Sequence, residues 1–277
     1  MITIKFSDNI PHRYKSFDKI LKLDNYNDII YLDCSCNNLS GLSNLPKLLE
    51  DLNCSNNNLS SLPKLPNSLK ILWCNYNKIS DLPNLPSSLI ELHCTNNNLF
   101  SLPELSNSLI KLQCGNNNLS SLPKLPNSLI ILWCHDNNLS NLPELPNKLI
   151  NLWCNNNNLS SLPELPNSLI HLCCCNNCLY SLPELPNSLI LLFCDYNNLS
   201  ILPELPDLIY FRYYNNPICD YIIKYFDSNI KIYIEYQNNI KRIFSNKIGN
   251  WFLDCKYNPK YLYCRKRLMK EYDELYN

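Results

Sequence analysis

The stretch NLWCNNNNLSSLPELPNSLI, residues 151–170, is one unit of a repeat that occupies most of the chain. Each unit contains the frame L-x-x-L-x-C-x-x-N-x-L, which in this copy begins two residues earlier, at Leu149. The copies follow one another at intervals of twenty residues, with one step of nineteen before the last. They begin at residues 29, 49, 69, 89, 109, 129, 149, 169, 189 and 208. A fixed period of this length predicts a solenoid, in which each unit buries its apolar side against its neighbours.

The residues around the cysteine of each unit predict a short β-strand. Leu152 and Cys154 are expected to face the core, and Trp153 between them is expected to face solvent. Strands of successive units then pair in parallel, about 4.8 Å apart. The prolines in the second half of the unit, such as Pro163 and Pro166, exclude a regular helix there. We therefore expect that half to be extended, polyproline-like chain.

The frame resembles the leucine-rich repeat pattern L-x-x-L-x-L-x-x-N/C-x-L. The second half of the unit, SSLPELPNS at residues 160–168, is similar to the short repeats of bacterial effector proteins of the YopM and IpaH type. The resemblance implies a leucine-rich repeat solenoid of the α/β horseshoe class, made mostly of short parallel strands with an extended convex side. It also implies that the asparagine of each unit turns inward and satisfies backbone groups at the bend. The residue bias and short proline-rich repeats are also similar to those of giant-virus and amoebal proteins.

The limits of the repeat predict three segments. Residues 29–218 hold the ten repeats. Because a solenoid exposes apolar surface at each end, residues 1–28 are expected to cap the N-terminal end. Residues 219–277 are expected to form a small, helical, basic and tyrosine-rich C-terminal cap, since apolar residues recur there at helical spacing.

Cysteine occupies the third apolar position of the strand in nine of the ten units. These residues are Cys34, Cys54, Cys74, Cys94, Cys114, Cys134, Cys154, Cys174 and Cys194. Residues 1–20 lack the apolar core of a signal peptide, and the chain has no apolar run long enough to span a membrane. We therefore expect an intracellular protein, cytoplasmic or nuclear, in which thiols stay reduced. A free cysteine packs as a small hydrophobic residue, so we interpret these positions as core.

The segment HLCCCNNCLY, residues 171–180, leaves an alternative open. His171, Cys173, Cys175 and Cys178 are metal-ligand types, and they would also suit a redox site. However, residues i, i+2 and i+4 on a strand are about 7 Å apart, which fits a tetrahedral metal centre poorly. We therefore expect no metal and no cofactor, with these four residues as the alternative.

The residue before the cysteine of each strand is expected on the concave surface, where solenoids bind their partners. The candidate binding residues are Trp73, His93, Trp133, Trp153, Phe193 and Arg212. An exposed apolar patch with Trp and Arg is typical of protein interfaces, so a protein or peptide ligand is favoured. The same tryptophans could instead stabilise the sheet through cross-strand contacts. Acidic residues on this face, such as Glu91, disfavour single-stranded nucleic acid, which requires a positive groove.

The C-terminal segment supplies the alternative function. Its densest basic cluster contains Lys260, Arg265, Lys266 and Arg267, which would attract nucleic acid or an anionic membrane. An enzyme is not expected. The chain has 3 glycines, too few for a Gly-rich phosphate loop, and no HExxH motif or Ser-His-Asp order. The sequence therefore predicts a non-enzymatic protein–protein interaction scaffold that binds its partner along the concave sheet.

Overall fold

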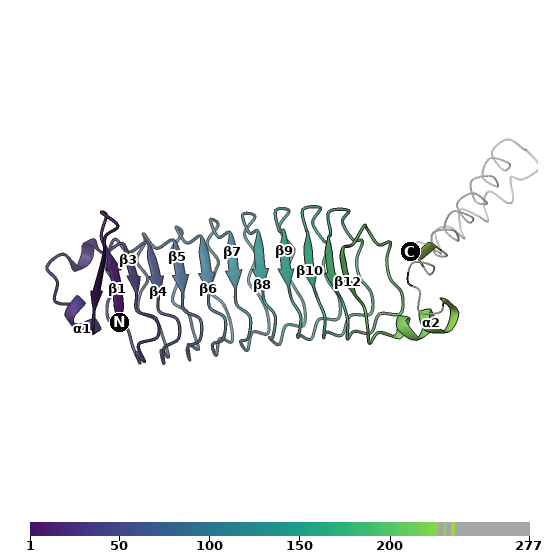
Figure 1. Ribbon diagram of the computed structural model, residues 1–277, viewed down its shortest axis with the longest axis horizontal. Coiled ribbons are helices and arrows are strands. Elements are labelled where there is room, and N and C mark those ends of the chain that lie inside the picture. Colours follow the sequence, from purple (N-terminus) through teal and green to yellow (C-terminus); the bar gives the residue numbers. More distant parts are fainter. Residues whose placement is uncertain (227–229, 231–233, 236–277) are drawn as a thin grey trace, which may run out of the picture. The chain divides into compact units, whose positions relative to one another are not determined.

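Figure 1 shows the computed structural model of the 277-residue protein. The structure describes residues 1–226, 230, 234 and 235. Two compact units are distinguished, Met1–Cys219 and Asp220–Asn277. None of the described helices is both long and apolar enough to cross a membrane.

The first unit is built on one twelve-stranded sheet, in which strands β3 to β12 lie in sequence order (Figure 1). Each repeat contributes one strand of three residues, and every strand pairs in parallel with the next. Leu132 of β8 lies opposite Leu152 of β9, and Trp133 lies opposite Trp153, so equivalent positions of successive units are neighbours. The solenoid expected from the repeat is therefore confirmed. The strands are β3 Tyr31–Asp33, β4 Asp51–Asn53, β5 Ile71–Trp73, β6 Glu91–His93, β7 Lys111–Gln113, β8 Ile131–Trp133, β9 Asn151–Trp153, β10 His171–Cys173, β11 Leu191–Phe193 and β12 Tyr210–Arg212.

The core lies behind the sheet and consists of repeated columns of leucine and cysteine. In the unit that contains β8, the side chains of Leu129, Leu132, Cys134 and Leu139 are fully buried. All nine cysteines of the repeated position are also fully buried. The interpretation of these cysteines as core residues is therefore confirmed.

A column of asparagines closes the bend after each strand. Asn137 donates from Nδ2 to the backbone carbonyls of Cys114 and Cys134, at 3.1 and 3.2 Å. Its Oδ1 accepts a hydrogen bond of 3.0 Å from the backbone N–H of Leu119 in the preceding unit. The residue before each such asparagine has a left-handed backbone, with φ of 53° at Asp136. Asn and Asp adopt this conformation more readily than most other non-glycine residues, and they occupy most of these positions. This side chain therefore supplies the buried backbone groups with partners, as the resemblance implied.

The proline-rich half of each unit contains neither helix nor strand in the repeats, in agreement with the expected extended chain. Serines connect these segments from one unit to the next. Ser168 donates to the backbone carbonyls of Asn147 and Leu149, at 2.8 and 2.7 Å. The side opposite the strands is therefore thin and held by hydrogen bonds between neighbouring turns.

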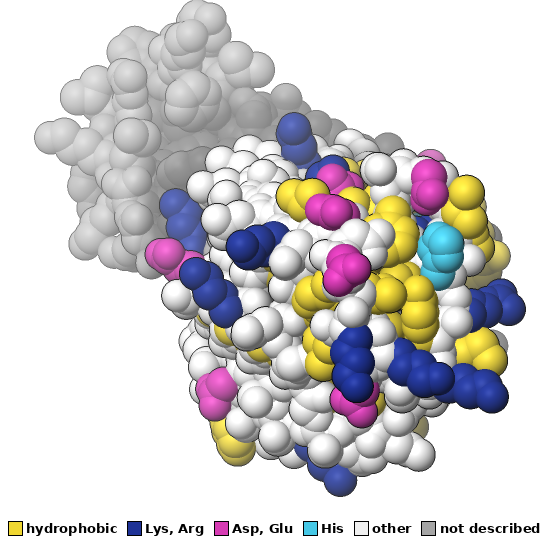
Figure 2. Space-filling view, turned by 90° about the vertical axis from the view of Figure 1, so that its left-hand side faces the viewer, with side chains coloured by type: hydrophobic (Ala, Val, Ile, Leu, Met, Phe, Trp, Pro, Cys, Tyr) yellow, Lys and Arg dark blue, Asp and Glu magenta, His cyan; other side chains and the backbone are white. Residues whose placement is uncertain are grey.

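Residues 1–28 extend the sheet at its N-terminal end. Strand β1 (Ile2–Lys5) pairs antiparallel with both β3 and β2 (Pro11–Tyr14). Two short helical segments follow, α1 (Phe17–Ile20) and a 3₁₀ helix (Tyr26–Asp28). Figure 2 looks onto this end, where hydrophobic side chains are interspersed with those of lysine and arginine. Strand β2 leaves an open edge with the exposed residues Pro11 and Arg13, which discourage pairing with another chain.

The last described helix, α2, spans Pro217–Phe226. It begins directly after the asparagine of the last unit, Asn216, and thus two residues before the expected start of the C-terminal segment at residue 219. The other helix predicted from the sequence, which begins at Asn258-Pro259, lies outside the described residues.

Candidate functional site: the exposed face of the sheet

The third residues of strands β3 to β12 point away from the core and lie in register across the sheet. We call this row the stripe. It consists of Asp33, Asn53, Trp73, His93, Gln113, Trp133, Trp153, Cys173, Phe193 and Arg212. The six candidate binding residues predicted from the sequence all belong to it, so the repeat brings them into one line.

Trp133 and Trp153 form the most prominent feature of the stripe. Their rings are stacked, with centroids 5.0 Å apart and planes inclined by 20°. Trp133 Nε1 donates to Asn151 Oδ1 at 3.3 Å, which fixes the orientation of the first ring. The side chain of Trp153 remains 38% exposed, a large fraction for so apolar a residue. The pair is therefore an oriented aromatic surface that is open to solvent.

Trp73 and His93 form a second stacked pair, with centroids 3.7 Å apart and planes inclined by 6°. His93 was expected to be exposed, but it is completely buried. Trp73 covers one face of the His93 imidazole. The imidazole Nδ1 lies 2.6 Å from Gln113 Oε1, and its Nε2 lies 2.9 Å from Glu91 Oε2. His93 therefore supports Trp73, which is 37% exposed, and offers little surface of its own.

Phe193 and Arg212 form a third group at the C-terminal end of the stripe. The guanidinium carbon of Arg212 lies 4.9 Å from the centroid of the Phe193 ring, a cation–π arrangement. Arg212 also donates from Nη2 to Asp195 Oδ2 at 2.9 Å. Asp195 is only 2% exposed, so its buried charge is balanced by this arginine. Both candidate residues thus contribute to the face, and Arg212 is already paired.

The N-terminal third of the face is acidic. Burial raises the pKa of Asp51, and the carboxylates of Asp33 and Glu91 raise it further. Lys5 acts in the opposite direction but does not outweigh these effects. Asp33, Asp51 and Glu91 thus lie close enough at this end of the sheet for their negative charges to act on one another.

The structure brings together two of the four residues of the alternative metal or redox site. The Sγ atoms of Cys173 and Cys175 are 3.5 Å apart. His171 instead lies beside Asn151, with Nδ1 3.5 Å from its Nδ2, and Cys178 is exposed in the following bend. Within the described part of the chain, no group of three or more His, Cys, Asp or Glu side chains is arranged to hold a metal ion.

The buried cysteines of the core behave differently from exposed thiols. Burial raises the pKa of Cys114 and of Cys154 to about 12. Since the thiolate is the reactive form, these residues are chemically inert at neutral pH. They serve as packing groups.

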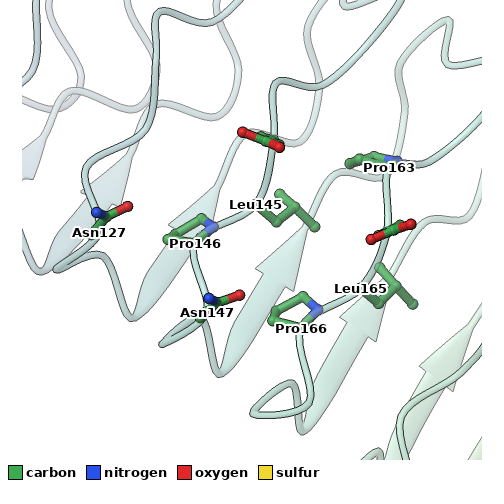
Figure 3. A pocket seen from close by; sticks show the side chains of 9 residues that line it. Asn127, Leu145, Pro146, Asn147, Pro163, Leu165 and Pro166 are labelled. Atoms are coloured by element: carbon green, nitrogen blue, oxygen red, sulfur yellow. The ribbon is translucent and has the colours of Figure 1, made fainter.

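On the proline-rich side, a hollow lies between successive units (Figure 3). Leu145 and Pro146 of one unit and Leu165 and Pro166 of the next line it. Its lining consists of residues of the common unit. The basic cluster of Lys260, Arg265, Lys266 and Arg267 lies outside the described residues.

Two features of the face were not predicted from the sequence. His93 forms hydrogen bonds with Glu91 of its own strand and with Gln113 of the next strand. The only signal in the sequence was the presence of polar residues at neighbouring positions of the two strands. The closeness of Cys173 and Cys175 depends on side-chain orientation at the end of β10. Their i, i+2 spacing placed both on one face but could not give the distance between the sulfur atoms.

Comparison with solved structures relates this architecture to two bacterial proteins. YopM, a leucine-rich effector protein from Yersinia pestis, superimposes with a TM-score of 0.62 and 38% sequence identity, over 68% of this chain and 61% of YopM. The functional domain of InlJ from Listeria monocytogenes, which includes a cysteine ladder, gives a TM-score of 0.56 and 26% identity, over 70% of this chain and 46% of InlJ. The chain thus spans about 61% of the length of the YopM structure. Neither a protein-family model nor a curated protein sequence matches the chain.

Proposed function

We propose that this leucine-rich repeat protein, whose units resemble those of bacterial effectors of the YopM type, binds a protein partner through the exposed face of its sheet. The stacked pair of Trp133 and Trp153 is the observation that carries the proposal. In this account the pair is the centre of the binding surface. Trp73 and Phe193 extend that surface toward the two ends of the solenoid.

The exposure of the tryptophans argues against a purely structural role. A ring that only stabilised the sheet would gain most from complete burial, yet Trp73 and Trp153 are 37% and 38% exposed. Tryptophan is also among the residues that contribute most energy to protein interfaces. Trp73 is already oriented by stacking on His93, and Trp153 by stacking on Trp133. These side chains would therefore lose little conformational entropy when a partner binds.

Charge on the same face favours a protein over single-stranded nucleic acid. Aromatic stacking on bases is normally combined with a positive groove that follows the phosphates. Here Asp33, Asp51 and Glu91 surround the N-terminal end of the stripe, and Arg212 at the other end is paired with Asp195. A partner with basic groups near the N-terminal end and apolar groups near Trp153 would fit this distribution.

The test compares partners captured from a nuclease-treated eukaryotic cell lysate by three forms of the full chain. These are the wild type, the double variant Trp133→Ala/Trp153→Ala, and a control variant, Phe100→Ala/Tyr180→Ala. Phe100 and Tyr180 are 64% and 66% exposed, but they lie outside the strands, before the proline-rich segments. Circular dichroism establishes that all three are folded, and mass spectrometry identifies the bound proteins.

We expect at least one protein to be retained by the wild type and the control but lost from the tryptophan variant. An identical set of proteins on all three would contradict binding through the tryptophans. Partners that disappear only with the control variant would move the binding surface to the proline-rich side. That the chain is not an enzyme, and that it acts inside cells, remain predictions.

A further inference from the structure

We propose that Cys173 and Cys175 form a reversible modification site, a dithiol that small-molecule disulfides of the glutathione type convert to an intramolecular disulfide. Both residues belong to the segment HLCCCNNCLY. Cys173 is the third residue of β10 and a member of the stripe, and the Cys175 sulfur lies beside its sulfur. The site is independent of the proposed partner. It requires only that an oxidised low-molecular-weight thiol reach the face.

The geometry of the two side chains suits disulfide formation. The sulfur atoms are 3.5 Å apart and must approach to the bond length of about 2.0 Å. Side chains at i and i+2 of an ideal strand have Cα atoms about 6.6 Å apart, close to the upper limit for a disulfide. Strand β10 ends at Cys173, so Cys175 is not held in the strand, and the chain bends directly after it at Asn176, whose φ is 51°. Because the sulfur atoms already lie side by side, we expect rotation of the two Cys side chains to close the bond.

The two thiols differ in the way a reactive pair requires. Cys173 is buried, whereas Cys175 is partly exposed. A hydrogen bond from the Cys173 thiol lowers the pKa of Cys175, and the positive charge of Arg212 acts in the same direction. Burial and the carboxylate of Asp195 oppose this shift without cancelling it. The same hydrogen bond raises the pKa of Cys173. Cys175 is thus the attacking thiol and Cys173 the resolving one.

The exchange then proceeds in two steps. The Cys175 thiolate attacks one sulfur of the small disulfide, whose S–S bond breaks; one small thiol leaves and takes up the proton lost by Cys175. The Cys173 sulfur next attacks the Cys175 sulfur, and the second small thiol leaves with the Cys173 proton. The protein loses two electrons and two protons and gains one S–S bond. The small disulfide is reduced to two thiols, and an excess of these thiols reverses the reaction.

Other described cysteines lack this combination of features. The nine core cysteines are fully buried, and Cys174 between the two reactive residues is one of them. Cys36 and Cys178 are exposed, but no other thiol lies within hydrogen-bond distance of either in the structure. Cys219 is partly exposed, and its thiol donates to the backbone carbonyl of Tyr213 at 3.2 Å. The absence of a neighbouring thiol therefore distinguishes Cys36 and Cys178 from the pair, and Cys178 serves as the internal control.

The experiment exposes the reduced full chain to glutathione disulfide at neutral pH, with remaining thiols then blocked by alkylation. Proteolysis and mass spectrometry locate disulfides and bound glutathione. The wild type is compared with Cys173→Ser, Cys175→Ser and the control Cys178→Ser. All three side chains lie outside the core columns, and circular dichroism checks that each variant is folded. A Cys173→Ala variant repeats the first substitution without a hydroxyl group.

We expect the wild type and Cys178→Ser to form a Cys173–Cys175 disulfide that retains no glutathione and is reversed by excess glutathione. In Cys173→Ser and Cys173→Ala the reaction should stop with one glutathione bound at Cys175. In Cys175→Ser, modification of Cys173 should be at least tenfold slower than disulfide formation in the wild type. Glutathione that persists on Cys175 of the wild type would overturn the proposal. So would a disulfide that includes Cys178, or a pair that stays reduced while Cys178 is modified.

Discussion

The two sides of the repeat strands differ in how much their residues vary from one unit to the next. Toward the core, the middle strand residue is leucine in β3 to β11, and the cysteine after the strand recurs in the same nine units. On the opposite side, the stripe changes from Asp33 through Trp153 to Arg212. The inner side, by which we mean the side of the strands that faces the core, must fit nearly identical neighbours, and its residues therefore repeat. The outer side, which carries the stripe, has no such constraint, so its residues can be specific for a binding partner.

The comparison predicts that stability resides in the inner columns and recognition in the outer face. Substitutions on the core side should then destabilise the fold in proportion to the packing contacts and hydrogen bonds that they remove. Outer substitutions should change binding while the free energy of unfolding is largely preserved.

The largest effect is expected from alkaline pH, because it acts on all the core thiols together. Burial raises the pKa of Cys114 and Cys154 from 9.0 to about 12, so the folded chain keeps protons that the unfolded chain releases above pH 9. Their stabilisation is complete below pH 9 and is lost as the pH rises toward 12. Each such thiol lowers the free energy of unfolding by about 1 kcal/mol per pH unit within that window.

Chemical denaturation of the reduced protein at pH 8, 9, 10 and 11 measures this dependence. The Cys114→Ala/Cys154→Ala variant is the control for lysine and tyrosine ionisation. Its free energy of unfolding should fall less steeply than that of the wild type, by about 2 kcal/mol per pH unit. Equal slopes would show that the core thiols ionise as easily in the folded chain as in the unfolded one.

A single asparagine of the inner column should have the next largest effect. Asn137→Ala removes the side chain that contacts the carbonyls of Cys114, Cys134 and His135 and the N–H of Leu119. Because these backbone groups are then left buried without partners, we expect a loss of about 3 kcal/mol in the free energy of unfolding. Urea denaturation measures it.

The neighbouring residue provides the matched control for that substitution. Asn138 is exposed, and only its backbone N–H is hydrogen bonded, to the carbonyl of Leu119 at 2.9 Å. Asn138→Ala should therefore change the free energy of unfolding by less than about 0.5 kcal/mol. Similar losses for both variants would mean that the asparagine column does not support the bend.

The smallest effect on stability is expected from the outer face. Trp133→Ala/Trp153→Ala removes a stacked pair, whose geometry contributes about 1 kcal/mol beyond its buried area. Since Trp153 is partly exposed, we expect the total loss to stay well below that of Asn137→Ala under the same urea denaturation. A loss as large as that of the asparagine variant would assign the tryptophans to the structure of the sheet.

The sequence was sufficient for the inner side because its period is strict. The spacing of Leu152, Cys154 and Asn157 fixes which residues face the core, and stacking of identical units fixes their neighbours twenty residues away. The extended proline-rich half followed from the missing N–H of proline.

The outer side was less predictable because its contacts depend on side-chain rotamers. His93 was assigned to the exposed stripe by its position, but stacking with Trp73 and contact with Gln113 bury it. The distance between Cys173 and Cys175 is likewise a property of two side-chain torsions. Position in a repeat gives the face on which a residue lies, whereas its exposure is decided by its neighbours.

The central claim is that the stacked tryptophans bind a partner without maintaining the fold. Isothermal titration calorimetry of a captured partner against the wild type and Trp133→Ala/Trp153→Ala, both in the full chain, measures this most directly. Loss of a central aromatic anchor should weaken binding at least tenfold, or about 1.4 kcal/mol, while both proteins unfold at similar urea concentrations. Unchanged affinity with a folded variant would contradict the account.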